Sequence, residues 1–346
     1  MLSLIDRLSK THQLQRSEWI ELLSNWTVTD ADYAAKLARA QAQKIFGRKV
    51  YTRGLIEFTN ICKNNCYYCG IRAGNTNVSR YRLDADHIMQ CAALGYQLGF
   101  RTFVLQGGED PYYTPENFAE IINSLRCTYP DCAITLSFGE YDRAVYQMWF
   151  DAGADRYLLR HETADPKHYS LLHPSELSSE YRKQCLKWLK EIGYQTGTGF
   201  MVGSPGQTVE NLADDFLFIR DLKPEMVGIG PFISHHDTPF ADQPNGSVTL
   251  TVFLLSLLRL MLPDVLLPAT TALGTLDPNG REKGILAGAN VVMPNLSPAD
   301  VRAKYMLYDN KLSAGAESAQ GLRELHERMK LIGYELAMER GDSPRI

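Results

Sequence analysis

Gly54-Leu-Ile-Glu-Phe-Thr-Asn-Ile-Cys62-Lys-Asn-Asn-Cys66-Tyr-Tyr-Cys69-Gly70 is the stretch that decides the fold of this chain. Its first five residues are mostly bulky and apolar, which predicts a short buried strand. A polar loop with three cysteines follows the strand directly. Three thiolates this close together can bind one soft metal centre, because thiolate sulfur prefers iron–sulfur clusters, zinc or copper(I). A cubane iron–sulfur cluster would keep one iron without a protein thiolate, open to a substrate or cofactor.

Two other interpretations of the cysteines remain open. Positions i, i+4 and i+7 share one helical face, so the cysteines could be three small buried residues of a helix. The polar residues 63–65 and the preceding strand argue against such a helix. Zinc loops usually pair two cysteine knuckles or add histidines, and no such second half is evident here. The iron–sulfur interpretation is therefore favoured over zinc and over plain packing.

The composition excludes several classes of partner. The chain has 346 residues and a net charge of −4, which gives no electrostatic footprint for nucleic acid or an anionic membrane. The N-terminus has an early acid and no long apolar run, so we expect no secretory signal. The most apolar segment, 252–262, is too short to span a bilayer. Seven cysteines without a signal predict a reducing cytoplasm, with ordinary packing roles for Cys91, Cys127, Cys132 and Cys185.

Short apolar runs alternate with amphipathic ones along most of the chain. The expected strands are 54–58, 102–106, 132–136, 155–160, 196–202, 226–230, 267–271 and 289–293. The expected helices are 84–98, 115–126, 141–152, 178–192, 208–221, 249–262, 278–287 and 298–306. This alternation favours an α/β fold with a closed (β/α)8 TIM-type barrel over an open doubly wound sheet. We expect three parts, namely an N-terminal helical extension (1–50), the barrel (51–310) and a C-terminal helical tail packed on it (311–346).

Polar residues and glycines gather at the predicted strand ends. In such a barrel the chemistry lies at the C-terminal face of the strands. The features at this face are the cysteine loop, Gln106-Gly107-Gly108-Glu109, Ser137, Arg160-His161-Glu162, Met201, Ile229, Thr270-Thr271 and Met293-Pro-Asn295. A merely structural barrel has no reason to place glycines and charges together on one rim. We therefore expect the active site at this face.

Two glycine-rich passages are candidates for ligand contact. Gly107 and Gly108 leave the backbone uncovered, so a ligand can approach it closely, although a plain turn remains an alternative. The passage from Gly197 to Thr208 lacks the ending of a Walker A loop and the spacing of a dinucleotide fingerprint. Close approach to an adenosyl group is the better interpretation. The side chains of 235–237 suit a metal, but adjacent residues point apart in an extended chain, so a loop is expected there.

The spacing Cys62-x3-Cys66-x2-Cys69, with Tyr68 before the last cysteine, resembles the signature of the radical S-adenosylmethionine (SAM) enzymes. The resemblance implies that the amine and carboxylate of SAM chelate the open iron of a [4Fe-4S] cluster. It implies that one electron from the reduced cluster cleaves the sulfonium and gives a 5′-deoxyadenosyl radical. It also implies that the backbone of the Gly-Gly-Glu stretch receives the amine of SAM.

Longer stretches are similar to the HydE family, the radical SAM maturases of [FeFe]-hydrogenase. They are residues 56–62, 105–113, 156–163, 228–233, 268–272 and 288–295. The likeness is collinear over roughly residues 50 to 310, which short motifs alone do not give. It implies a barrel with SAM at the top, a deep internal cavity, and a role in building the di-iron subcluster of the H-cluster. The implied substrate is an iron–carbonyl–cyanide–cysteine precursor made by a partner maturase.

The resemblance also assigns roles to single residues. Cys62, Cys66 and Cys69 hold the cluster and are the catalytic residues. The residues around SAM are Tyr68, Gln106, Gly107, Gly108, Glu109, Ser137, Glu162, Arg182, Met201 and Ile229. The residues lining the substrate cavity are Arg160, Thr270, Thr271, Met293, Tyr305 and Tyr308. A guanidinium and paired hydroxyls suit an anionic guest. The implied partners are a small organometallic or amino-acid-derived substrate, an electron donor and other hydrogenase maturases.

One departure from the family pattern and two rival functions remain. Some members carry a second cysteine set near the C-terminus for an accessory cluster, but no cysteine follows Cys185 here, so we expect that cluster to be absent.

The first rival is a radical SAM mutase that acts on an amino acid, similar to methylornithine synthase. The second rival is a non-enzymatic iron–sulfur or zinc carrier.

Overall fold

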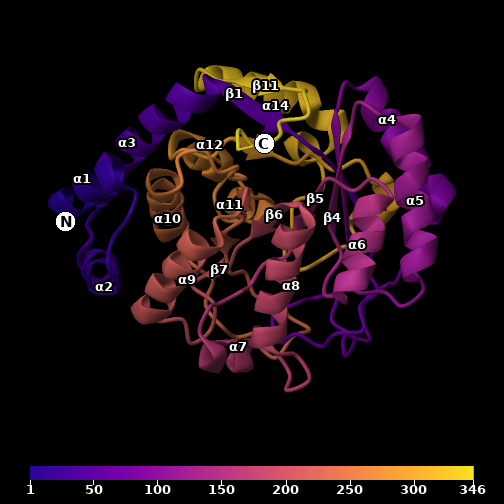
Figure 1. The fold of residues 1–346 in the computed structure, drawn as a ribbon, viewed down its shortest axis with the longest axis horizontal. Coiled ribbons are helices and arrows are strands. Elements are labelled where there is room, and N and C mark those ends of the chain that lie inside the picture. Colours follow the sequence, from indigo (N-terminus) through magenta and orange to yellow (C-terminus); the bar gives the residue numbers. More distant parts are fainter. Residues whose placement is uncertain (346) are drawn as a thin grey trace.

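The computed structural model describes residues 1–345 as an α/β fold built on a parallel sheet (Figure 1). The strands are β1 (Lys49–Thr52), β2 (Gly54–Thr59), β3 (Thr102–Gly107), β4 (Ala133–Ser137), β5 (Arg156–Leu158), β6 (Gln195–Thr198), β7 (Met201–Val202), β8 (Met226–Val227), β9 (Gly230–Pro231), β10 (Val291–Val292) and β11 (Glu335–Ala337). The helices are α1 (Leu2–Thr11), α2 (Arg16–Asn25), α3 (Val28–Phe46), α4 (Ala85–Gln97), α5 (Pro115–Thr128), α6 (Arg143–Asp151), α7 (Pro166–Leu172), α8 (Ser179–Ile192), α9 (Val209–Leu222), α10 (Val248–Met261), α11 (Thr271–Leu276), α12 (Gly280–Leu286), α13 (Ala299–Arg302) and α14 (Leu322–Leu331).

The main sheet contains six parallel strands in the order β2-β3-β4-β5-β6-β8. These strands are apolar and buried at most positions, as parallel strands covered by helices are. β3 is buried until its carboxyl end, where Gln106 and Gly107 are half-buried. Single parallel bridges connect β8 back to β2, and they pair Met226 with Leu266, Pro268 with Val291, and Leu55 with Asn295.

A smaller sheet joins the start of the main fold to the end of the chain. β1 lies between β10 and β11 and pairs with both in parallel. Figure 1 shows β1 at the top of the molecule beside β11 and α14. The predicted tail, 311–346, is therefore only partly helical, because it also contributes a strand and two short 3-10 helices, η1 (Gly315–Glu317) and η2 (Ala319–Gly321).

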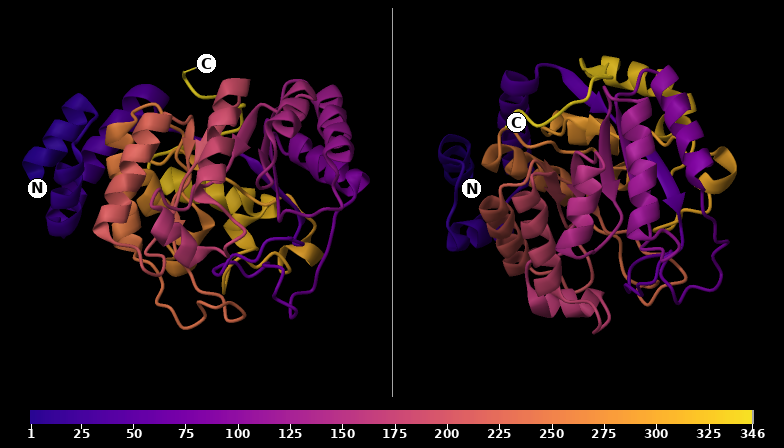
Figure 2. Two further views of the ribbon diagram at one scale, coloured as in Figure 1. Left: turned by 60° about the horizontal axis from the view of Figure 1, so that its bottom comes forward. Right: turned by 45° about the vertical axis from the view of Figure 1, so that its right-hand side comes forward.

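The first three helices pack against the outer helices α9 and α10 (Figure 2, left). Trp19 of α2 is fully buried and stacks on Phe216 of α9, with ring centroids 4.3 Å apart. Trp26 stacks on Phe253 of α10 at 4.7 Å. Two large aromatic contacts thus fix the N-terminal extension to the body of the fold. None of the helices within residues 1–345 is both long and apolar enough to cross a membrane.

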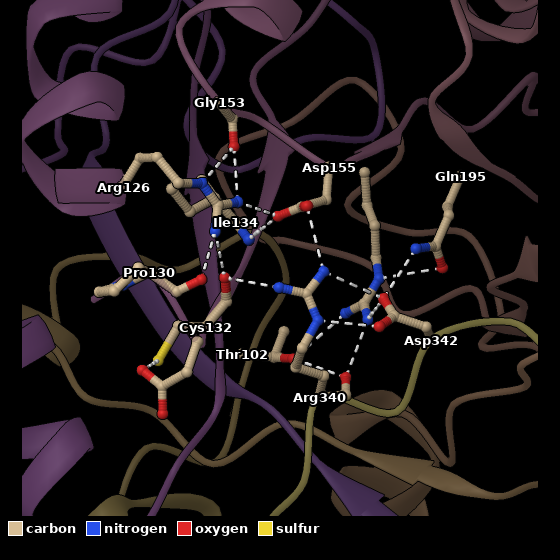
Figure 3. A network of polar contacts seen from close by, with 12 residues as sticks. Thr102, Arg126, Pro130, Cys132, Ile134, Gly153, Asp155, Gln195, Arg340 and Asp342 are labelled. Carbon is tan, nitrogen blue, oxygen red and sulfur yellow. Dashed lines mark hydrogen bonds and ion pairs between the residues drawn. The ribbon is translucent and has the colours of Figure 1, made fainter. Parts of the chain in front are cut away.

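A network of charged residues ties residues 340–343 to the amino ends of the central strands (Figure 3). The side chain of Arg156, at the start of β5, is fully buried. Its guanidinium donates to Asp342 at 2.6 Å and to the backbone oxygen of Arg340 at 2.8 Å. Gln195, which begins β6, donates to the same carboxylate at 2.8 Å. The buried guanidinium is therefore neutralised by a residue far away in the sequence.

Four sequence predictions of elements are wrong in detail. The strand expected at 267–271 forms only single bridges, because Pro268 has no N–H for a ladder and Thr271 already begins α11. The strands expected at 196–202 and 226–230 are each split in two. Gly199 lies between the first pair with a φ of 157°, and it approaches the backbone of Gly228 too closely for any side chain. The helix expected at 298–306 spans only Ala299–Arg302.

Candidate active site

One cavity of about 340 Å³ lies at the carboxyl ends of the main strands. Its wall is formed by β2, β3 and β4, by the segments that follow β5 and β9, and by the segment 305–311. The predicted site residues on this wall are Tyr68, Cys69, Gln106, Gly107, Ser137, Arg160, Glu162, Arg182, Met201, Thr270, Thr271, Met293, Tyr305 and Tyr308. Residues predicted from separate strand ends therefore meet in one space.

Five predicted site residues are not part of the cavity wall, namely Cys62, Cys66, Gly108, Glu109 and Ile229. The side chain of Ile229 is fully buried among core residues. Glu109 lies in a separate surface hollow, where it pairs with the ammonium of Lys63 at 3.2 Å. Burial raises the pKa of Glu109. The remaining three belong to the cysteine loop or pack against it.

The three cysteines of the loop are free, half-buried thiols. Burial, followed by the effect of the neighbouring Cys62, raises the pKa of Cys69 to about 12. Burial, Cys69 and Cys62 also raise the pKa of Cys66. Buried thiols whose thiolates would repel one another lose their protons readily only when a cation binds them. This donor set fits a bound iron–sulfur cluster, whose iron supplies that positive charge.

Backbone hydrogen bonds hold the cysteine loop against three other segments. The amide of Lys63 donates to the carbonyl oxygen of Glu109 at 2.9 Å. The amide of Tyr67 donates to that of Leu172 at 3.0 Å, and the amide of Gly70 donates to that of Leu307 at 2.8 Å. These segments follow β3, end α7 and precede the cavity residue Tyr308. The cysteine loop is therefore fixed to the rim of the cavity by backbone hydrogen bonds.

Gly108 is required by close packing on the cysteine loop. A Cβ atom there would lie 2.3 Å from the carbonyl oxygen of Ile61 and 2.7 Å from the Cβ of Cys62. At Gly107, a Cβ atom would lie 2.8 Å from Thr59. The two glycines thus allow the segment after β3 to pack closely on the segment after β2. Of the two, only Gly107 borders the cavity.

Arg160 and Glu162 present unsatisfied polar atoms near the cavity. Their side chains lie 3.0 Å apart (Nη2 to Oε2), without the geometry of a hydrogen bond. The Nε and Nη2 of Arg160 and the Oε2 of Glu162 are buried and have no hydrogen-bond partner within the described chain. Glu162 also has a φ of 64°, a strained value for a residue with a side chain. Orphaned buried polar atoms and backbone strain together are typical of a ligand site.

His161, which lies between these two residues, points away from the cavity into a buried polar pair. Its Nε2 lies 3.3 Å from Asp215, and its Nδ1 lies 2.9 Å from the hydroxyl of Thr198. Burial lowers the pKa of His161 to about 3, so the imidazole is neutral. Asp215 also accepts from the amide of Ala164. His161 and Asp215 thus stabilise the backbone around the strained residue Glu162, and they do not line the cavity.

The two threonines predicted to act as a pair differ in the structure. The hydroxyl of Thr271 donates to Glu317 at 2.8 Å, so its proton is already used. The hydroxyl of Thr270 is buried and has no partner within the described residues. Of these two threonines, only Thr270 therefore has a free donor for a guest in the cavity.

Sequence reasoning missed a buried ion pair on the cavity wall. Glu57 of β2 accepts from Lys311 at 2.8 Å and from Asn295 at 2.7 Å. The side chain of Glu57 is fully buried, and that of Lys311 is 8% exposed. A carboxylate in the middle of an apolar strand was a signal for Glu57, since buried charges need partners. The sequence around Lys311 carries no comparable signal.

The histidines expected in a loop form a small cluster with Asp309. The rings of His235 and His236 stack 4.5 Å apart, and Asp309 accepts from Nδ1 of His236 at 2.7 Å. The Nδ1 of His235 accepts the amide of Asp237 at 3.1 Å. Hydrogen bonds to Asp309 and to the amide of Asp237 thus hold the two histidines in place.

Comparison with known proteins identifies the family of this site. Residues 56–219 match the Radical SAM superfamily. The chain is 45% identical over 311 residues to the [FeFe] hydrogenase maturase subunit HydE of Thermotoga maritima, covering 90% of this chain and 88% of that protein. The chain belongs to the HydE family. It is accordingly a radical SAM enzyme, and its cofactors are a [4Fe-4S] cluster and SAM.

More distant relatives share the fold. The chain is 27% identical to 3-methylornithine synthase of Methanosarcina acetivorans, over 96% of this chain and 93% of that protein. The crystal structure of methylornithine synthase PylB superposes with a TM-score of 0.83 at 27% identity, covering 96% of this chain and 97% of that one. HydG, a maturase of the [FeFe]-hydrogenase, superposes with a TM-score of 0.81 at 17% identity, over 97% of this chain and 76% of that one, which shows a common fold. An enzyme family therefore replaces the carrier hypothesis.

Proposed function

We propose that this protein acts in the maturation of [FeFe]-hydrogenase, on a precursor of the di-iron subcluster of the H-cluster. The observation that supports the proposal most is the 45% identity to HydE of Thermotoga maritima along nearly the whole of both chains. A bound [4Fe-4S] cluster would supply the electron for reductive cleavage of SAM. Cys62, Cys66 and Cys69 are the proposed cluster ligands.

The cavity residues have two proposed tasks. Tyr68, Gln106, Gly107, Ser137, Glu162, Arg182 and Met201, which line the cavity, would surround SAM. For Gly108, Glu109 and Ile229, which do not line it, contact with SAM is proposed from the family resemblance alone. Arg182 is anchored for this task, since it pairs with Glu140 and donates to the backbone oxygen of Arg160 at 3.0 Å. The guanidinium of Arg160 and the hydroxyl of Thr270 would bind an anionic substrate. This is supported by the Nε of Arg160 and the hydroxyl of Thr270, which have no hydrogen-bond partner within the described residues, whereas the Nη2 of Arg160 forms an ion pair with Glu162 at 3.0 Å. Thr271, Met293, Tyr305 and Tyr308 would complete the substrate side of the wall.

We further propose that the sheet closes into a (β/α)8 barrel. The support is the series of bridges that leads from β8 through 266–268 and 291–295 back to β2. Each bridge is accompanied by backbone hydrogen bonds, for example from Val227 to Leu266 at 3.0 Å and from Leu296 to Leu55 at 2.7 Å. In this arrangement residues 51–310 form the barrel, 1–50 the helical extension and 311–346 the tail.

The proposed partners are a small organometallic or amino-acid-derived substrate, an electron donor and other hydrogenase maturases. The proposed location is the cytoplasm, where thiols such as these stay reduced. A cavity of about 340 Å³ lies within the size range of small-molecule sites.

In vitro maturation tests the proposal directly. Apo-hydrogenase is incubated with the other maturases and with anaerobically reconstituted protein, and hydrogen evolution is measured. We expect activity with the wild-type chain and none with single Ala variants of the three cysteines, which should also fail to form 5′-deoxyadenosine. Cys127→Ala is the matched control, because this exposed thiol lies outside the site. SAM cleavage without any hydrogenase activation would refute the maturation role and leave the radical SAM chemistry standing.

A second comparison separates the two threonines and the rival substrate. Thr270→Val should weaken maturation more strongly than Thr271→Val, because only the first removes a hydroxyl without a partner. Equal effects would contradict the assignment of Thr270. The likeness to methylornithine synthase keeps an amino-acid mutase as the alternative. Formation of 3-methylornithine by the wild-type protein, with no hydrogenase activation, would favour that alternative.

A further inference from the structure

Arg80 contacts the cysteine loop from outside the cavity. Its Nη1 donates to the carbonyl oxygens of Asn60 at 2.6 Å and Ile71 at 2.8 Å. Its Nη2 donates to those of Arg72 at 2.7 Å and Asn75 at 2.8 Å. The first carbonyl precedes Cys62, and the other three follow Cys69. One guanidinium therefore holds both ends of the loop that carries the three thiols.

The four hydrogen bonds of Arg80 all go to backbone oxygens, and no ion pair with a carboxylate is found for it within residues 1–345. Its half-buried guanidinium is satisfied by backbone oxygens alone. The planar fork of an arginine can reach four carbonyls at once, whereas the single ammonium of a lysine cannot span two sides of a loop. The positive charge is thus left without a neutralising partner in the protein.

The guanidinium of Arg80 lies close to two of the three cysteines along the chain. Its Nη1 contacts the carbonyl oxygen of Asn60, two residues before Cys62, and that of Ile71, two residues after Cys69. Its positive charge is therefore placed beside the loop that would hold the cluster.

Neighbouring amides fix the frame in which Arg80 lies. The side chain of Asn60 donates to the carbonyl oxygens of Ser79 at 2.9 Å and Lys304 at 2.7 Å, and it accepts the amide of Tyr81 at 2.8 Å. The side chain of Asn75 donates to the carbonyl oxygen of Gly70 at 2.8 Å. These bonds connect residues 60, 70, 75 and 79–81 into one unit around the guanidinium.

We propose that Arg80 is a positioning residue that holds the cysteine loop ready for metal before the cluster is inserted and keeps one uncompensated positive charge beside the bound cluster. The proposal rests on the assignment of the three cysteines as cluster ligands, and it does not depend on the substrate. Holding the loop lowers the conformational entropy that cluster binding must overcome. A fixed positive charge favours the reduced cluster, which carries one more electron.

Two variants separate the geometric from the electrostatic part. Arg80→Gln removes both the fork and the charge, and Arg80→Lys removes the fork but keeps the charge. Arg82→Gln is the matched control, because this arginine lies two positions away and its guanidinium binds Asp110, at 2.6 and 2.9 Å, and not the carbonyls of the cysteine loop. Amide hydrogen exchange of residues 60–75 is measured on the iron-free proteins. Iron content and the midpoint potential are measured after anaerobic reconstitution.

For Arg80→Gln we expect at least about tenfold faster exchange in the loop, less iron per chain, and a more negative midpoint potential than in the wild-type protein. For Arg80→Lys we expect fast exchange with a potential close to that of the wild type. Wild-type exchange in the lysine variant would overturn the clamp, and an unchanged potential in a cluster-loaded glutamine variant would overturn the electrostatic role. The same shifts in Arg82→Gln would overturn both. A cluster that survives in Cys62→Ala would instead refute the ligand assignment.

Discussion

The buried pair of Glu57 and Lys311 gives the sharpest prediction for stability. Lys311→Met removes the ammonium that lies 2.8 Å from the carboxylate and leaves Asn295 as the remaining donor. The side chain of Glu57 is completely buried from the outer surface, so its charge depends on the few groups around it. Removing one partner of a buried pair costs about 3 to 5 kcal/mol. Because Asn295 still donates, we expect the lower end, a loss of about 3 kcal/mol.

The assay is urea unfolding of the cluster-free protein, followed by tryptophan fluorescence and circular dichroism, whose transitions must coincide for a two-state analysis. Lys49→Met is the matched control. Lys49 pairs with Glu339 at 2.7 Å, but its side chain is 46% exposed, and exposed pairs contribute little. The double variant with Glu57→Gln should lose less than the sum of the single changes. If Lys311→Met loses no more stability than Lys49→Met, the reasoning from burial is refuted.

Three further outcomes follow from single contacts. Trp19→Ala should cost about 3 to 5 kcal/mol in urea unfolding, because it empties a fully buried site stacked on Phe216, and an unchanged midpoint would contradict this. Gly199→Ala should lower the yield of folded protein, because the new methyl group would meet a facing backbone oxygen at 1.9 Å; normal expression and melting would show that this approach is not required. Burial alone would raise the pKa of Asp342, but hydrogen bonds from Arg340 and the charge of Arg156 hold this pKa below its usual value. The ionised carboxylate therefore stabilises the fold fully above about pH 4, and this stabilisation is lost as the pH falls below that value. The urea midpoint should therefore fall less on acidification in Asp342→Asn than in the wild type.

Local signals made most helices predictable. Thr114 caps α5 and is followed by Pro115 at the first helical position, and Thr208 begins α9 with a capping box. These patterns use residues three or four positions apart, which a sequence displays directly. The cysteine loop was predictable for the same reason, because its chemistry lies within eight residues.

Features that depend on distant partners could not be predicted in this way. β1 becomes a strand because β10 and β11 flank it, and both come from the last sixth of the chain. Thr270 and Thr271 look alike in the sequence, and only the position of Glu317 distinguishes them. Arg80 carries no sequence signal at all, since its partners are backbone carbonyls. Tertiary contacts decided each of these cases.

The carboxylate that neutralises Arg156 lies 186 positions further along the chain. At the usual speed of translation, that interval takes on the order of ten seconds or more. During this time a newly made polypeptide exposes a guanidinium destined for a dry interior, together with strand edges that have no neighbour. The guanidinium of Arg156 therefore gains its buried partner only after residue 342 has left the ribosome.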